Sequence, residues 1–279
     1  MMNKVKFFDV RVREKFIRYA SAITGFIAAA VIFIDIPTKY KIASGVFLVF
    51  VLAISYYYFW REANKLKAIT LKVEGSTVNI TTGDIFKAEG FKVIAFNEYF
   101  DTLVDEKVIS SKSLNGIFLK KHLPCTLVEL DQYIEAYDFD EDEFIEENKG
   151  RRQGKTRKYQ IGTLCVYEDY LMAAFSKFDD KNQARLTMPE YLEFLINFWD
   201  KVNKVYAQRS VSVPIFGSGI TRIKEHKNIT DEELLKIMLW TFRISEMRFK
   251  HPAKLTIVIH EDKIDMINLL DLKSARNGL

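Results

Sequence analysis

Apolar residues are distributed unevenly and divide the chain into two parts. Two apolar segments near the N-terminus, about residues 17–36 and 42–60, carry no charge over residues 19–34 and 42–60, and a short polar turn with Pro37 joins them. Each segment is close to the roughly 20 residues that an α-helix needs to cross a bilayer. Because the turn is so short, the two helices must run antiparallel. The pattern therefore predicts a transmembrane helical hairpin over residues 1–66.

Two other structures produce apolar segments of this kind. A signal peptide is disfavoured because a second apolar segment follows at once and no clear small-residue cleavage pattern separates the two. A buried helix pair in a soluble core is disfavoured because such helices normally keep a polar stripe. Small residues, Gly25 and Gly45 among them, allow close helix packing and permit self-association within the membrane.

Basic residues flank the hairpin on one side. Six of them lie between residues 4 and 18, and three more follow the second segment between residues 61 and 67. The turn has only Lys39 and Lys41, offset by Asp35. Because basic residues are retained on the cytoplasmic side of a membrane, both termini are expected in the cytoplasm. The aromatic residues between 56 and 60 fit either an interfacial belt or a packing surface.

Strand-like and helix-like segments alternate from residue 67 to residue 279. Capping boxes at Thr187 and Thr230 predict the starts of two helices, and residues 262–272 read as a last helix. Such alternation predicts a layered α/β domain that follows the hairpin. The expected strands are residues 68–74, 76–81, 92–96, 211–216 and 255–260, with a hairpin formed by residues 159–167 and 171–176.

Composition and charge exclude several classes of function. The net charge of +4 is small and gathers at the membrane ends, so no nucleic-acid partner is expected. Two distant cysteines, Cys125 and Cys165, indicate a reducing compartment. The four histidines lack ligand spacing, so no metal site is expected.

One segment has an acidic run followed by a basic run. Residues 138–147 are strongly acidic and residues 149–158 strongly basic. The simplest interpretation is a solvated helix end and loop. The basic part would otherwise contact anionic lipid headgroups or the phosphates of a ligand.

Two short motifs point to a ligand. The strand at residues 211–216 runs into the loop Gly217-Ser218-Gly219, and glycine lets backbone N–H groups approach phosphate oxygens. The alternative for this loop is an ordinary tight turn. The second motif is Gly83-Asp84-Ile85 after a strand. Its aspartate either caps a helix or accepts a hydrogen bond from an adenine amino group.

In this order and spacing, the motifs over residues 68–279 resemble a macro domain. The resemblance rests on Gly83 to Ile85, the run 93–97 that ends in Asn97, the loop 214–220 and the closing segment 255–272. It implies that Asp84 and Ile85 hold adenine, that the glycine loop holds a diphosphate, and that Asn97 lies beside the distal ribose. The expected ligand contacts are Asp84, Ile85, Asn97, Phe100, Pro214, Phe216, Gly217, Ser218, Gly219, Ile220 and Thr221.

The sequence departs from the family pattern at one informative place. Macro domains that remove ADP-ribose carry a second asparagine in the loop after the third strand. Here Phe100 stands at that position, or Glu98 or Asp101 if the alignment slips by a residue. The departure favours binding over hydrolysis and assigns Phe100 to a roomier distal pocket.

The whole arrangement resembles the effector of a bacterial type II Thoeris antiphage system. That resemblance implies a partner TIR-domain enzyme that consumes NAD and makes an ADP-ribose-derived signal, a histidine conjugate. It also implies a homo-oligomer that disrupts the inner (plasma) membrane, with no resident cofactor and no catalysis. The alternatives are a membrane-tethered ADP-ribosyl hydrolase and an anchored interaction module with a vestigial pocket.

Overall fold

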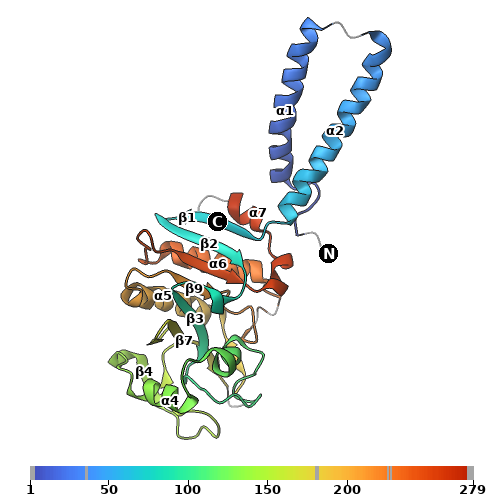
Figure 1. Ribbon diagram of the computed structural model, residues 1–279. Helices are drawn as coiled ribbons and strands as arrows, with labels where there is room; N and C mark the ends of the chain where they lie inside the picture. Colours follow the sequence, from blue (N-terminus) through green and yellow to red (C-terminus); the bar gives the residue numbers. More distant parts are fainter. Residues whose placement is uncertain (1–3, 35–36, 180–181, 225, 227, 275–279) are drawn as a thin grey trace. The chain divides into compact units, whose positions relative to one another are not determined.

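The computed structural model describes residues 4–34, 37–179, 182–224, 226 and 228–274 (Figure 1). These residues form two compact units. Residues 4–67 and 265–274 make the first, and residues 68–264 make the second. The expected boundary lay at residues 66 and 67, with everything after it in one domain. In the structure, residues 265–274 belong to the same compact unit as the hairpin.

The first unit contains the two long apolar helices, α1 (Val10–Phe33) and α2 (Thr38–Asn64), and the short α7 (Leu269–Ser274). The long helices have 24 and 27 residues, or about 36 and 40 Å at 1.5 Å per residue, which exceeds the roughly 30 Å hydrocarbon core. Their apolar stretches are not buried within the structure. Both helices therefore fit a transmembrane hairpin. The expected end of the first span, at residues 35 and 36, lies outside the described residues.

The first helix begins seven residues before the expected span because Asp9 caps it. The Asp9 carboxylate accepts a hydrogen bond from the Arg11 N–H at 2.9 Å, so the basic residues from Arg11 to Arg18 belong to the helix. Asp271 of α7 pairs with Arg11 in the same unit. The basic flank is thus part of an ordered structure.

The aromatic residues at the end of α2 fall into two groups. Trp60 donates its indole N–H to the Val5 carbonyl at 2.9 Å, and the Phe7 ring packs edge-on against Tyr56 and Trp60. These residues form a packing surface. Tyr57 and the adjacent tyrosine at 58 remain exposed, so an interfacial belt stays a prediction for that pair.

The described part of the second unit is built on a sheet with the strand order β1-β2-β11-β9-β3-β7-β8-β10, to which β6 adds beside β7. Five consecutive strands of this order run parallel to one another, namely β2, β11, β9, β3 and β7. The bounds are β1 Ala68–Val73, β2 Ser76–Thr82, β3 Phe91–Asn97, β6 Leu164–Tyr167, β7 Tyr170–Phe178, β8 Ala184–Leu186, β9 Val211–Pro214, β10 Arg222–Ile223 and β11 Leu255–Ile259.

Helices α5 (Met188–Val205) and α6 (Asp231–Ile244) begin where the capping boxes predict, after Thr187 and Thr230. They pack on each other through Trp199, whose ring meets Phe242 edge-on at 5.1 Å. The smaller elements are η1 (Ile85–Lys87), α3 (Leu114–Ile117), η2 (Phe118–His122), α4 (Leu127–Ala136), η3 (Glu141–Glu143) and η4 (Glu261–Met266).

Two local expectations are corrected. The expected hairpin starts at β6, because Tyr159 belongs to another pair of strands. The last helix is broken into η4 and α7, since the Asn268 side chain accepts the Leu270 N–H at 3.1 Å and so caps a new helix.

Candidate ligand-binding site

The parallel strands β9 and β3 are neighbours, but they pair only near their starts. Their register joins Phe91 to Val211 and Lys92 to Ser212. Later in the chain, the next strand that runs parallel to β9 in this sheet is β11, which pairs with β9 on the side away from β3. The next strand after β3 that runs parallel to it in this sheet is β7, which pairs with β3 on the side away from β9. This is a topological switch point, and ligands of open α/β sheets bind outside the carboxyl ends of the strands at such points.

The glycine loop, residues 214–221, leaves the carboxyl end of β9. Its first half is anchored in the core. Phe216 is buried and its carbonyl accepts the Tyr191 hydroxyl at 3.0 Å, while the Ser218 hydroxyl donates to the Ile215 carbonyl at 2.8 Å. Gly217 has a φ of +83°, in the left-handed region that favours glycine. These contacts fix where the loop turns.

The second half of the glycine loop is open. Gly219 and Ile220 are exposed, and a Cβ added at Gly219 would meet nothing within 4 Å. Within the described residues, the backbone N–H groups of Gly217, Gly219 and Ile220 donate to no acceptor. Ser218 between them donates its N–H to the Ile215 carbonyl, so the adjacent free amides are those of Gly219 and Ile220. Adjacent free amides in a glycine-containing turn form a concavity suited to an anion. The loop therefore has the chemistry of a phosphate site as well as the shape of a turn.

The second motif lies at the carboxyl end of β2. Gly83 donates its N–H to the Ile259 carbonyl at 3.0 Å, which ties it to β11. Asp84 caps η1 by accepting the Phe86 N–H at 3.0 Å, and its side chain remains exposed. Ile85 is buried. Asp84 thus has the capping role, and adenine recognition stays a prediction. A hollow of about 500 Å³ over the sheet face reaches Asp84 at one end.

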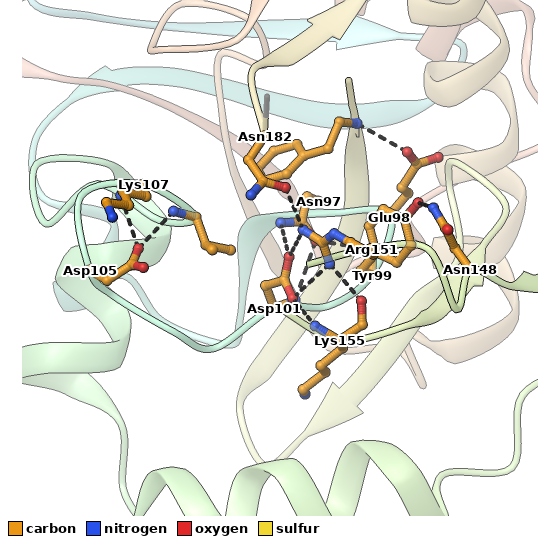
Figure 2. Close-up of polar contacts among 12 residues, drawn as sticks. Asn97, Glu98, Tyr99, Asp101, Asp105, Lys107, Asn148, Arg151, Lys155 and Asn182 are labelled. Atoms are coloured by element: carbon orange, nitrogen blue, oxygen red, sulfur yellow. Dashed lines mark hydrogen bonds and ion pairs between the residues drawn. The ribbon is translucent and has the colours of Figure 1, made fainter. Parts of the chain in front are cut away.

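The third predicted contact lies at the carboxyl end of β3. Asn97 is buried, and both ends of its side-chain amide are used within the loop 97–101 (Figure 2). Its Nδ2 donates to Asp101 Oδ2 at 2.8 Å, and its Oδ1 accepts the Tyr99 N–H at 3.0 Å. Asn97 therefore holds the shape of this loop. Direct contact between Asn97 and a ribose stays a prediction.

Phe100 has an unexpected position. Its φ is +50°, and its ring is fully buried with Phe96, Phe139 and Tyr159 around it. The turn directs this side chain into the core, where burial of a large ring is favourable. Contact between Phe100 and a ligand would require the ring to leave that cluster.

Asp101 is the centre of a buried ionic network that sequence reasoning missed (Figure 2). Arg151 contacts both carboxylate oxygens, at 3.0 Å from Nη1 and 2.6 Å from Nη2, and the Lys155 N–H donates to Oδ1 at 2.6 Å. The side chains of Asp101 and Arg151 are 0% and 7% exposed. The guanidinium also lies 3.9 Å from the centre of the Tyr99 ring.

The charged segment 138–158 contains a β-hairpin in place of the expected helix end and loop, although most of its residues are exposed. Its strands β4 (Phe144–Glu147) and β5 (Arg157–Tyr159) pair antiparallel, and Arg151 in the turn between them reaches Asp101. A basic run gives no sign of which of its members is buried. Only the run's nearness in space to a buried aspartate distinguishes Arg151 from its neighbour Arg152, which is exposed.

Glu98 is buried beside this network. Its Oε1 accepts the Phe178 N–H at 3.0 Å, and Lys158 Nζ lies 3.9 Å from Oε2. Burial raises the pKa of Glu98, and the Phe178 hydrogen bond and Lys158 oppose that rise only in part. Both carboxylate oxygens of Asp101 accept hydrogen bonds, whereas Glu98 Oε2 has no hydrogen-bond partner among the described residues. The described residues contain no group of acidic, histidine or cysteine side chains suited to a metal ion.

Sequence comparison assigns this chain to a known family. Residues 78–260 match the family described as Thoeris protein ThsA, macro domain. The chain is also 42% identical over 217 residues to the Thoeris protein ThsA of Bacillus amyloliquefaciens (strain Y2), across 76% of this chain and 72% of that protein. This chain belongs to the Thoeris protein ThsA family.

Solved macrodomains give weaker likenesses. The Oceanobacillus iheyensis macrodomain with ADP is 14% identical, with a TM-score of 0.45 over 74% of this chain and 95% of that one. The same macrodomain with MES bound is 16% identical, with a TM-score of 0.35 over 74% and 96%. The macro-domain assignment of this ThsA-family chain rests on the family match.

The ThsA-family match spans the three loops at the carboxyl ends of β2, β3 and β9, and also the segment 138–158. The chain therefore combines a macro domain with two helices that fit a transmembrane hairpin. Macro domains bind ADP-ribose or hydrolyse it. Which of the two this chain does depends on its own residues.

Proposed function

We propose that this ThsA-family chain is a membrane-anchored antiphage effector whose macro domain binds an ADP-ribose-derived signal. The observation that carries this proposal is the glycine loop at the switch point, where the N–H groups of Gly217, Gly219 and Ile220 have no acceptor within the described residues. A diphosphate offers the negative oxygens that such amides bind, and charge-assisted hydrogen bonds of this type are the stronger ones. Family membership supports the defence role.

The signal is proposed to be the histidine conjugate of ADP-ribose, made from NAD by a TIR-domain enzyme. In this assignment adenine lies near Asp84, the diphosphate lies on the glycine loop and the distal group lies near the loop 97–101. The three loops leave the carboxyl ends of strands in one sheet, as a ligand that bridges them requires. No resident cofactor is invoked.

The hairpin is the part of the proposed effector that acts on the membrane. We place both termini in the cytoplasm and the hairpin in the bacterial inner membrane, so that the macro domain meets a cytoplasmic signal. A ligand shifts an equilibrium only by its differential affinity for two states. If an assembly of chains binds the signal more tightly than a single chain does, binding of the signal favours the assembly. Such a homo-oligomer raises the local concentration of hairpins, which then disrupt the membrane.

We propose binding without turnover. The carboxylates of Glu98 and Asp101 accept hydrogen bonds from protein groups, and Asn97 is used within its loop. None is directed by these contacts toward a reacting atom. The alternative, an ADP-ribosyl hydrolase, predicts release of ADP-ribose from a modified protein that is lost in Asn97→Ala. The expected result is no release by the wild type.

The decisive measurement is calorimetric titration of the full chain in lipid nanodiscs with ADP-ribose and with its histidine conjugate. The expected result is tight binding of the conjugate, weaker binding of ADP-ribose, and loss of both in Gly219→Glu. The new side chain has room, since nothing lies within 4 Å of the Cβ position, so it should repel the diphosphate without unfolding the loop. Asn203→Glu adds the same charge at an exposed site on α5 and should bind normally. Absence of wild-type binding to either compound would refute the proposal.

A further inference from the structure

Lys263 lies outside the residues matched by the family and outside the predicted ligand contacts, yet it touches the glycine loop. It belongs to η4, and its Nζ donates to the Ser218 carbonyl at 3.1 Å. The same Nζ lies 3.0 Å from Oδ2 of Asp231, the first residue of α6. The Asp231 side chain is only 11% exposed. Two fixed partners therefore hold the ammonium group in one place.

The contact with the Ser218 carbonyl determines which way the next amide points. The only cis peptide bond among the described residues is His251–Pro252, so the bond between Ser218 and Gly219 is trans. In a planar trans peptide the C=O and the following N–H point in opposite directions. With the carbonyl directed at Lys263, the Gly219 N–H points away from Lys263, and its residue is exposed.

Without this contact the peptide would have little to hold it. Glycine accepts backbone conformations that other residues avoid, so the planar peptide group between Ser218 and Gly219 can turn as a unit about the single bonds on either side of it. One orientation presents an N–H donor to an anion, and the other presents a carbonyl oxygen, which repels it. Preorganisation of the first orientation removes an ordering cost from binding.

We infer that Lys263, held by Asp231, is a positioning residue that orients the Gly219 N–H toward the diphosphate of the ligand. This inference rests on the proposed function, since it concerns the same loop. Lys263 acts through the Ser218 carbonyl. It also lies two residues before Asp265, where the chain enters the unit that contains the hairpin.

The test is calorimetric titration of the full chain in nanodiscs with ADP-ribose, using Lys263→Met, Lys263→Arg and Asp231→Asn. Loss of a hydrogen bond from a charged donor predicts about tenfold weaker binding for Lys263→Met. Lys263→Arg keeps a charged donor and should bind within about threefold of the wild type. Melting temperatures of the two Lys263 variants should stay close to the wild-type value, because Lys263 is 35% exposed.

Asp231→Asn separates positioning from direct charge attraction. If Asp231 holds Lys263 in place, its loss weakens binding in the same direction as Lys263→Met. If Lys263 instead contacts the phosphates directly, removal of a competing carboxylate leaves binding unchanged or strengthens it, which would overturn the inference. Wild-type affinity in Lys263→Met, with binding still lost in Gly219→Glu, would overturn the role of Lys263 alone. Absence of wild-type binding would overturn the proposed function as well.

Discussion

The ion pair of Arg151 with Asp101 gives the sharpest prediction. Arg151→Met keeps the length of the side chain and removes its charge, leaving a carboxylate that is 0% exposed without its guanidinium partner. Breaking a buried pair in this way costs about 3–5 kcal/mol, because one charge stays in a poorly solvated site. The Lys155 N–H and Asn97 Nδ2 still donate to Asp101. We therefore expect a destabilisation of about 3 kcal/mol, the low end of the range.

The assay is urea unfolding of the full chain in micelles, followed by tryptophan fluorescence in a Trp60→Phe background. The remaining tryptophans, Trp199 and Trp240, both lie in the macro domain. The matched control is Arg152→Met, an identical change at the adjacent exposed residue, which should alter the unfolding free energy by less than about 0.5 kcal/mol.

A double-mutant cycle completes the argument. Arg151→Met combined with Asp101→Asn removes both charges of this pair, so the double variant should be less destabilised than the sum of the two single variants, with a coupling of about 1–3 kcal/mol. Simple additivity would refute the claim that the two charges compensate each other. So would an unfolding free energy for Arg151→Met that matches Arg152→Met.

Two further predictions concern the loop and a capping residue. Gly217→Ala should destabilise the macro domain by about 1–2 kcal/mol, because Gly217 has a φ of +83°, whereas Gly219→Ala should be nearly neutral; equal urea midpoints would contradict this. For Glu190, burial raises the pKa, but hydrogen bonds from Thr187 and Lys177 outweigh it and lower the pKa to about 2. Its stabilisation is therefore complete above about pH 4.5 and is lost as pH falls toward 2. Urea midpoints measured from pH 6 to pH 3 should fall less steeply in Glu190→Gln than in the wild type.

The sequence predicted several features that depend on neighbouring residues. The long uncharged segments indicate the hairpin, because bilayer thickness sets a helix length. Thr187 and Thr230 mark the starts of α5 and α6, because a capping box satisfies N–H groups three residues away. The glycine loop follows from residue types alone, since only glycine adopts the turn at Gly217 without strain.

Only the tertiary structure decided the features that depend on distant residues. Arg151 is joined to Asp101, 50 residues earlier in the chain, and Lys263 to Ser218, 45 residues earlier. A local pattern gives the charge and the periodicity of a segment but not the partners of its residues. It therefore predicts a solvated Arg151 and gives no signal for Lys263. The alignment with the macro-domain pattern predicts that Phe100 faces the ligand. In the structure, the φ of +50° at Phe100 directs its ring into the core. Which charges are buried, and which amides stay free for a ligand, is settled by contacts across the fold.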